Sequence, residues 1–294
     1  MKIAIASGKG GTGKTTVAVN LALSQEQVLL LDCDVEDPDA ALLLHPEILS
    51  VTPVTVFVPK IISERCTSCD ACCEACAFGA MAVVSGRLFL TEELCKDCGA
   101  CYLVCPENAL VPRAREIGTL TRGRAAAGIT LVAGDLAPGE AMATAVIQRV
   151  KAEAVAGRPV IIDAPPGTAC SMVHAIEDAD LCLMVTEPTP YGRHDLEQAL
   201  DVADALAVPT AVVINRCDLG DSGVRALCKE RGVKVLLEIP FDQALAEAYA
   251  AGRPAVDADA RWLPVFRRLW DDLVELVSER RRQVLVGADL EADE

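Results

Sequence analysis

Short apolar runs alternate with stretches of helical periodicity along most of the chain. Seven of these runs predict β-strands, at residues 2–7, 28–32, 130–133, 159–163, 181–186, 210–215 and 235–239. Helices are expected between them, over residues 14–24, 140–156, 195–207 and 223–231. This alternation predicts an α/β fold with a mostly parallel sheet flanked by helices on both faces.

The alternation is interrupted once, between residues 61 and 112, where two groups of cysteines flank a short apolar stretch. Strand-like segments at residues 54–58 and 115–119 border the interruption and can form a two-stranded neck. We therefore expect residues 1–60 and 113–294 to form one domain and residues 61–112 to form a smaller α+β module inserted into it.

A glycine-rich loop follows the first predicted strand and opens the first predicted helix. Its residues fit the pattern G-x-x-x-x-G-K-[ST], in which backbone amides and the helix N-terminus surround phosphate oxygens. Lys14 is expected to reach the β- and γ-phosphates of ATP, and the Thr15 hydroxyl to bind Mg²⁺. The residues predicted to surround the nucleotide are Gly8, Gly10, Gly11, Thr12, Gly13, Lys14, Thr15 and Thr16.

Lys9 extends this pattern, because the sequence K-G-G-T-G-K-T resembles the deviant Walker motif of the MinD/ParA/Mrp ATPases and the nitrogenase iron protein. The segment from Leu30 to Asp34 resembles the D-x-D element of that family, and the segment from Val160 to Thr168 resembles its Walker B strand and switch turn. The resemblance covers most of residues 1–60 and 113–280. It implies a Mg²⁺-dependent ATPase.

The resemblance also implies roles for single residues. Lys9 would cross a dimer interface to the nucleotide of the other subunit, in an ATP-dependent homodimer or a heterodimer with a paralogue. Asp34 would orient or deprotonate the attacking water, and Asp163 would hold Mg²⁺ through a water. Gly167 would let the switch turn sense the γ-phosphate, and Asn215 stands where the family reads adenine. By themselves, Asp32 and Asp34 could equally be a solvated strand end, and Asn215 a helix cap.

The cysteines between residues 61 and 112 form two copies of the run C-x₂-C-x₂-C-x₃-C typical of bacterial ferredoxins. In such runs three closely spaced thiolates bind one [4Fe–4S] cluster, and the fourth cysteine binds the other cluster. The first cluster is therefore assigned to Cys66, Cys69, Cys72 and Cys105, and the second to Cys95, Cys98, Cys101 and Cys76. Small neighbours such as Gly99 leave room for backbone amides near the sulfurs.

Zinc is the rival interpretation, because two C-x₂-C pairs can form a tetrahedral site, but eight cysteines in two complete runs exceed what zinc needs. The first run departs from the pattern at Ala77, where proline is common, and at Cys73, which adjoins a ligand and is assigned as a bystander. Cys33 and Cys182 lie in apolar strands and are expected in the core. A reactive or metal-linked role of Cys170, after the switch turn, stays open.

Composition and charge argue against some classes of binding partner. The chain has 294 residues, 14 cysteines, 52% apolar residues and a formal net charge of −16. Three basic and seven acidic side chains give residues 61–112 a charge of −4. Nucleic-acid binding needs clustered basic residues, so it is not expected. No leader and no apolar run of roughly 18 residues is evident, so a reducing cytoplasm is the expected location.

A broad apolar helical face lies near the end of the sequence, formed by Trp262, Leu263, Phe266, Leu269, Trp270, Leu273, Val274 and Val277. A membrane-binding helix of the MinD type is the alternative interpretation of this face. Because Asp271, Asp272 and Glu275 interrupt it, we expect the helix to pack on the core.

Three functions fit these observations. The first is an ATP-dependent switch that gates electron transfer from two clusters to a redox partner. The second is a scaffold that assembles or delivers a metallocluster to an acceptor protein, in the manner of the Mrp carriers. Those carriers use a C-x₂-C pair in the C-terminal half, and none exists here outside the inserted module. The third is a redox-sensing positioning ATPase.

Overall fold

A central sheet of nine strands organises the protein. The computed structural model describes residues 1–155 and 157–291, with side chains as far as residue 282. The strand order is β11-β10-β9-β1-β8-β2-β7-β6-β3, and the seven strands from β11 to β7 are parallel. These seven are β1 (Lys2–Ala6), β2 (Leu29–Asp32), β7 (Thr130–Leu136), β8 (Val160–Asp163), β9 (Leu181–Thr186), β10 (Thr210–Asn215) and β11 (Lys234–Ile239). The predicted fold class and all seven predicted strands are confirmed.

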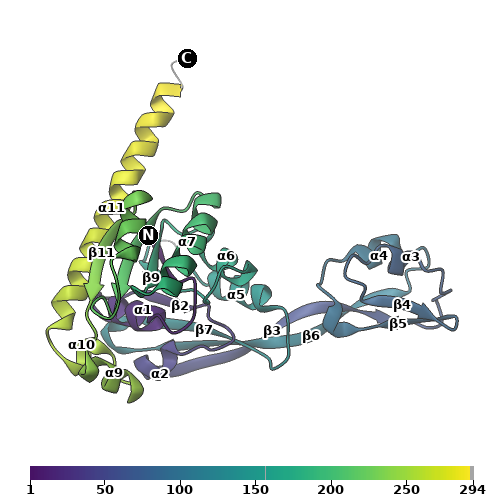
Figure 1. The fold of residues 1–294 in the computed structure, drawn as a ribbon. Coiled ribbons are helices and arrows are strands. Elements are labelled where there is room, and N and C mark those ends of the chain that lie inside the picture. Colours follow the sequence, from purple (N-terminus) through teal and green to yellow (C-terminus); the bar gives the residue numbers. More distant parts are fainter. Residues whose placement is uncertain (156, 292–294) are drawn as a thin grey trace.

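Two layers of helices cover the sheet (Figure 1). Alternate residues of each strand point to opposite faces of the sheet. Ala4 belongs to the core cluster with α5 to α8, and Ile3 and Ile5 belong to the cluster with α1, α2 and α11. The helices are α1 (Lys14–Leu23), α2 (Ala40–Leu44), α5 (Ala143–Lys151), α6 (Cys170–Ile176), α7 (Pro190–Ala205), α8 (Gly223–Glu230), α9 (Gln243–Ala250), α10 (Ala255–Ala258) and α11 (Trp262–Glu291).

Two of the predicted helices have different bounds. The third begins five residues earlier than predicted, because Pro190 fits the first helical position and the hydroxyl of Thr189 accepts a 3.0 Å hydrogen bond from the amide of Gly192. The second begins only at Ala143, because the preceding Glu140 turns its carboxylate toward Arg115 and the amide of Ala141.

A long two-stranded arm extends from one edge of the sheet. It consists of β3 (Glu47–Ile61) and β6 (Leu110–Arg124), which pair in antiparallel fashion along their whole length. Only Gly118–Arg124 of β6 also pairs with β7. The predicted neck was therefore too short, because one half of each strand belongs to the central sheet and the other half projects from it.

The cysteine-rich segment lies at the tip of this arm, away from the helical layers (Figure 1). It contains α3 (Ala71–Glu74), a hairpin of β4 (Met81–Val84) and β5 (Arg87–Leu90), a 3₁₀ turn (Glu92–Leu94) and α4 (Ala100–Val104). A second 3₁₀ turn, Ala126–Gly128, connects β6 to β7. This arrangement supports the proposed division into residues 1–60 and 113–294 with an insertion over residues 61–112.

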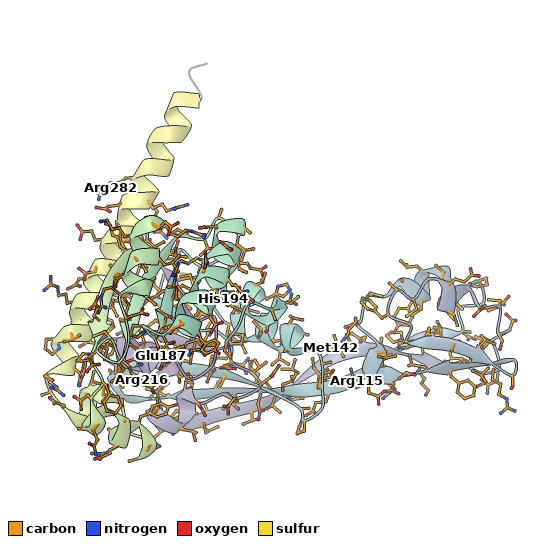
Figure 2. All side chains as sticks on the ribbon, in the orientation of Figure 1. Arg115, Met142, Glu187, His194, Arg216 and Arg282 are labelled. Carbon is orange, nitrogen blue, oxygen red and sulfur yellow. The ribbon has the colours of Figure 1, made fainter. Side chains whose placement is uncertain are left out.

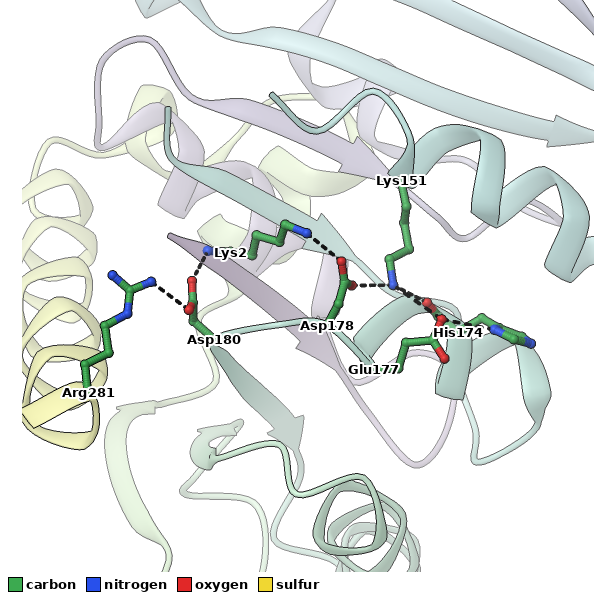
Figure 3. A network of polar contacts seen from close by, with 7 residues as sticks. All are labelled: Lys2, Lys151, His174, Glu177, Asp178, Asp180 and Arg281. Carbon is green, nitrogen blue, oxygen red and sulfur yellow. Dashed lines mark hydrogen bonds and ion pairs between the residues drawn. The ribbon is translucent and has the colours of Figure 1, made fainter. Parts of the chain in front are cut away.

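The last helix, α11, packs on the sheet. Trp262, Phe266, Leu269, Trp270, Leu273 and Val277 are buried in the core cluster of that face. Arg281 donates a 2.7 Å hydrogen bond to Asp180, whose other oxygen accepts from the amide of Lys2 (Figure 3). The expected core-packing role is confirmed, and no helix within the described residues has the length and apolar character to span a membrane.

Candidate functional site

The glycine-rich loop connects β1 to α1. Gly13 adopts a left-handed φ of 97°, and a Cβ on it would lie 2.7 Å from Nδ2 of Asn215. The same Nδ2 donates a 2.8 Å hydrogen bond to the carbonyl oxygen of Thr12. Gly8 has no room for a side chain either, because its Cβ would lie 2.1 Å from the carbonyl oxygen of Asp195. Only glycine fits these two positions, so the loop is tightly constrained.

A cavity of about 630 Å³, open to solvent, lies against this loop. Its wall contains six of the predicted residues, namely Gly10, Gly11, Gly13, Lys14, Thr15 and Thr16. Asp34, Pro165 and Asn215 complete the part nearest the loop. Of the other predicted residues, Gly8, Lys9, Thr12, Asp163 and Gly167 do not line the cavity. The space is large enough for a nucleoside triphosphate.

Several residues of the cavity wall were not predicted from the sequence. They include Pro240, Phe241, Leu245 and Tyr249. Pro240 and Phe241 directly follow β11, and carboxyl ends of parallel strands gather at ligand sites. Their position after a predicted strand was therefore the available signal. Tyr249 lies on α9, far from any motif, and no signal in the sequence pointed to it.

Lys14 and Asp34 face each other in the cavity. Nζ of Lys14 lies 3.9 Å from Oδ2 of Asp34, and both side chains are largely buried. Burial raises the pKa of Asp34 to about 6; Lys14 opposes the shift, and the charges of Asp37, Asp39 and Glu36 add to it. A carboxyl group with such a pKa can accept a proton near neutral pH.

Asp32 and Asp163 are register neighbours on β2 and β8, but they differ in their surroundings. The carboxylate of Asp32 accepts hydrogen bonds from the amides of Asp34 (3.2 Å) and Ala40 (3.1 Å). Asp32 therefore fixes the loop that carries Asp34 and has a structural role.

Asp163 is fully buried, and neither of its carboxylate oxygens has a hydrogen-bond partner among the described residues. Burial raises its pKa to about 7; the Thr15 hydroxyl and Lys14 counteract this, while Asp34 and Asp39 add to it. An unpaired buried carboxylate beside the Thr15 hydroxyl provides the oxygen donors that Mg²⁺ prefers. These residues therefore fit a magnesium ion bound with a nucleotide.

The switch turn after β8 touches the glycine-rich loop. The amide of Gly167 donates a 3.0 Å hydrogen bond to the carbonyl oxygen of Ser7. Gly167 has a φ of 92° and no atom within 4 Å of the position of a Cβ. Its lack of a side chain thus serves backbone conformation, and the turn has space to move.

Lys9 does not line the cavity and instead contacts a carboxylate. Its Nζ lies 3.2 Å from Oε2 of Glu187, and the other carboxylate oxygen of Glu187 accepts a hydrogen bond from Arg216. Figure 2 shows Glu187 and Arg216 next to each other, directly after the ends of β9 and β10. Neither contact was predicted from the sequence. The role of Lys9 at the nucleotide of a second subunit stays a prediction.

The eight predicted ligand cysteines surround two separate cavities at the tip of the arm. Cys66, Cys69, Cys72 and Cys105 line one of them, and Cys76, Cys95, Cys98 and Cys101 line the other. The fold thus brings together the same two groups of four, each with three cysteines from one run and the last from the other.

The two halves of this module repeat with an offset of 29 residues. The amide of Ala80 donates a 3.3 Å hydrogen bond to Sγ of Cys76, and the amide of Ala109 donates a 3.2 Å bond to Sγ of Cys105. Amides directed at sulfur stabilise a thiolate and help to set a cluster potential. The amides belong to residues that the sequence analysis did not single out.

These cavities fit an inorganic group held by several thiolates. Among the described residues, no three histidine, cysteine, aspartate or glutamate side chains converge closely enough to enclose a single metal ion. Four cysteines line each cavity, and four-thiolate sets are the donors of iron–sulfur clusters.

The remaining cysteines lie outside both cavities. Cys33 and Cys182 are buried in the core, as expected, and so is Cys228. Cys73 is half-buried, and burial, together with a hydrogen bond to Asp70, raises its pKa to about 12. Cys170 is exposed at the start of α6. Nothing in these surroundings assigns a reaction to Cys73 or Cys170.

Comparison with known proteins extends this description. The model of the CobQ/CobB/MinD/ParA nucleotide binding domain matches residues 3–255. An uncharacterized protein of Methanocaldococcus jannaschii is 30% identical over 258 residues, which are 86% of this chain and 90% of the relative. An iron-sulfur cluster carrier protein of the same organism is 25% identical over 303 residues, covering 95% of this chain and 86% of the relative.

Among solved structures, the chain is similar to the septum site-determining protein MinD of Pyrococcus horikoshii OT3, which was determined in complex with Mg-ADP. The TM-score is 0.55 at 18% sequence identity, and the match covers 94% of this chain and 96% of that chain. A likeness at this identity shows the fold alone.

Proposed function

Because the chain belongs to the CobQ/CobB/MinD/ParA family of nucleotide-binding P-loop proteins, we propose that it hydrolyses ATP and couples its nucleotide state to two [4Fe–4S] clusters. In this proposal ATP binding gates electron transfer from the clusters to a partner protein. The observation that carries it is the arm, because β6 pairs with β7, the neighbour of the strand β2 that leads to Asp34, and continues into the cysteine module.

The nucleotide site supports Mg²⁺-dependent hydrolysis. Lys14 would bind the β- and γ-phosphates, and the Thr15 hydroxyl would bind Mg²⁺, with Asp163 holding the ion through a water. Asp34, at the cavity wall, would orient the attacking water and accept its proton. Gly167 would transmit loss of the γ-phosphate to the glycine-rich loop through its bond to Ser7.

Hydrolysis would take place in a dimer, formed by two copies of this chain or with a paralogue. Lys9 lies outside the wall of its own cavity and is partly exposed, so it would reach the nucleotide of a facing subunit once it leaves its contact with Glu187. A cation at the transferring phosphoryl group stabilises the charge that develops there, as an arginine finger does.

Cys66, Cys69, Cys72 and Cys105 would hold one cluster, and Cys95, Cys98, Cys101 and Cys76 the other. When bound, each cluster supplies one-electron redox chemistry. Retention in four-cysteine sites favours electron transfer over delivery. The partner would be a redox protein that docks on the module, and a nucleic acid or a membrane is not proposed as a partner.

A scaffold or carrier function is the second candidate. The similarity to an iron-sulfur cluster carrier protein favours it, and one cysteine of each set, Cys69 and Cys98, is exposed. A positioning ATPase that senses redox state is a weaker third candidate. It is supported only by the MinD-like fold, since α11 packs into the core.

One experiment separates the first two candidates. The protein is purified anaerobically, its clusters are reduced, and ATP is added with either a redox acceptor or an apo-protein that accepts clusters. The proposal expects an ATP-dependent rise in the visible absorbance of the clusters as the acceptor oxidises them, which re-reduction reverses, with iron retained. Loss of iron to the apo-protein during ATP hydrolysis would instead establish the carrier function.

A further inference from the structure

The carboxylate of Glu187 contacts two cationic side chains next to the nucleotide cavity. Its carboxylate contacts Nζ of Lys9 at 3.2 Å and accepts a hydrogen bond from the guanidinium of Arg216. The side chain of Glu187 is 12% exposed, whereas those of Lys9 and Arg216 are 32% and 45% exposed. The carboxylate is thus held in place, and both cations retain a path to solvent.

The backbone around Glu187 is fixed by its neighbours. A Cβ on Gly192 would lie 2.3 Å from the carbonyl oxygen of Glu187, so the first turn of α7 packs directly against this residue. The amide of Asp221 donates a 3.0 Å hydrogen bond to the carbonyl oxygen of Pro188. Two loops therefore hold the turn after β9, and Glu187 has a defined position before any ligand binds.

Lys9 cannot serve two sites at once. A lysine ammonium held by Glu187 in its own chain is withdrawn from the face where a second subunit would dock. Tyr191 in the first turn of α7 and Leu219 in the loop after β10 also expose apolar side chains here, at 79% and 59%. This region therefore combines a retained cation with apolar surface suited to a protein contact.

We propose that Glu187 is a positioning residue that holds Lys9 within its own subunit and so opposes ATP-dependent dimerisation. A second copy of the chain with bound nucleotide must draw Lys9 away from Glu187 before the dimer is complete. This inference rests on the proposed transfer of Lys9 across a dimer interface. It assigns Glu187 a role in dimerisation and predicts that loss of the Glu187 charge strengthens the dimer.

The size of the effect follows from the exposure of the cations. A partly exposed ion pair contributes about two- to fivefold to an equilibrium constant. Both subunits must release a lysine, so the factor applies twice and reaches about 4- to 25-fold for the dimer. A contact of this strength lowers the dimer fraction at low ATP, and saturating nucleotide overcomes it.

Glu187 could instead serve only to brace Arg216, which lines the nucleotide cavity. The two roles differ in sign. If Glu187 braces Arg216, removing its charge frees the guanidinium, weakens nucleotide binding to the monomer and weakens the dimer. If Glu187 retains Lys9, the dimer tightens, and it does so even when Arg216 is absent.

The test measures the monomer–dimer equilibrium of the full chain by sedimentation, anaerobically, with Mg²⁺ and AMPPNP. The variants are Glu187→Gln, Arg216→Gln and the double variant, with affinity of the monomer for the nucleotide measured alongside. Glu153→Gln is the matched control, since Glu153 pairs with Arg122 at 2.7 Å, distant in sequence from the nucleotide loop. It should leave the dimer constant unchanged.

We expect Glu187→Gln to strengthen the dimer about 4- to 25-fold in both the wild-type and the Arg216→Gln backgrounds. A weaker or unchanged dimer, or a gain that disappears in the Arg216→Gln background, overturns the role of Glu187 and leaves the proposed function intact. If the wild type and every variant stay monomeric with nucleotide, the proposed dimer fails, and this inference fails with it.

Discussion

The amide of Leu136 donates a 2.8 Å hydrogen bond to the carbonyl oxygen of Val35. Val35 directly follows Asp34 of the nucleotide cavity, and Leu136 ends β7. The next amide, that of Ala137, donates a 2.9 Å bond to the carbonyl oxygen of Ile117 in the arm. Two successive backbone hydrogen bonds therefore connect the Asp34 loop to the strand that carries the cysteine module.

A buried ion pair reinforces this connection. Arg115 of the arm contacts Glu140 in the loop after β7, with side-chain exposures of 16% and 7%. Figure 2 places Arg115 and Met142 at the root of the arm, between the sheet and the module. Burial opposes the shift, but the hydrogen bonds from Arg115 and the amide of Ala141 lower the pKa of Glu140.

The metal content is the first prediction. Anaerobically purified protein should contain about eight iron atoms and eight sulfides per chain, because two cubanes each hold four of both. Elemental analysis and acid-labile sulfide assays measure this directly. Stoichiometric zinc, or only four irons, would contradict the assignment of two clusters.

Replacement of single cysteines should distinguish ligands from bystanders. Cys98→Ser should degrade one cluster, because Cys98 lines the second cavity, and should lower iron content by up to about four atoms. Cys73→Ser is the matched control, since Cys73 lines neither cavity although it adjoins Cys72. Electron paramagnetic resonance of the reduced variants checks both. Loss of a cluster signal from the Cys73 variant would refute the ligand sets.

Asp34 and Lys14 should affect the nucleotide cycle in different ways. Asp34→Ala should retain ATP in a dimer with turnover reduced about 10²- to 10⁴-fold, because the group that activates the water is lost. Lys14→Ala should lose nucleotide affinity, because it removes the cation at the phosphates. Light scattering in Mg-ATP and nucleotide binding assays measure both. A monomeric Asp34 variant with bound ATP would disprove the dimer.

The buried carboxylate of Asp163 should cost stability in the nucleotide-free protein. Its pKa of about 7 lies above the value near 3.9 of an unfolded aspartate, so the folded chain binds this proton more tightly. Stability from this group is present at low pH and is lost as the pH rises through about 7.

Asp163→Asn removes that charge, and at pH 8 it should stabilise the free protein by about 1–3 kcal/mol. It should also abolish the extra stability that Mg-ATP gives the wild type. Thermal unfolding with and without Mg-ATP checks both effects. A variant less stable than the wild type when free, or still stabilised by Mg-ATP, would show that Asp163 does not serve the metal.

The sheet, the glycine-rich loop and the grouping of the cysteines follow from local sequence patterns. Strand and helix periodicities are set by neighbouring residues, and the spacing of the two cysteine runs sets which of them can share a cavity. Asp32 was harder to interpret, because the same D-x-D pattern fits a site residue and a loop anchor, and only its bonds to Asp34 and Ala40 distinguish them.

Other features depend on contacts between distant segments. The length of the arm was underestimated, because Pro53, Pro59 and Pro112 break the strand pattern, although pairing between β3 and β6 runs past them. The contact between Lys9 and Glu187 joins residues 178 positions apart, at the ends of strands β1 and β9. No periodicity or motif encodes such a pair, so only the folded arrangement reveals it.

Coupling between nucleotide and clusters needs a control that separates it from general instability. Glu140→Gln is suitable, because it leaves the nucleotide cavity and both cysteine cavities unchanged and weakens only the contact with Arg115. The variant should retain both clusters and bind nucleotide. The shift of the cluster midpoint potential on nucleotide binding should decrease. An unchanged shift would place the coupling outside the Arg115–Glu140 contact.

The central claim is that nucleotide state and cluster state are coupled. Redox titration of the anaerobic protein with and without Mg-AMPPNP tests it most directly. Nucleotide affinities are measured alongside for both oxidation states of the clusters. Coupling of 1–3 kcal/mol is typical and must be reciprocal. The account predicts a shifted midpoint potential for at least one cluster and a matching change in affinity, about 59 mV for each tenfold change in a one-electron couple. Identical potentials and affinities in all states would contradict it.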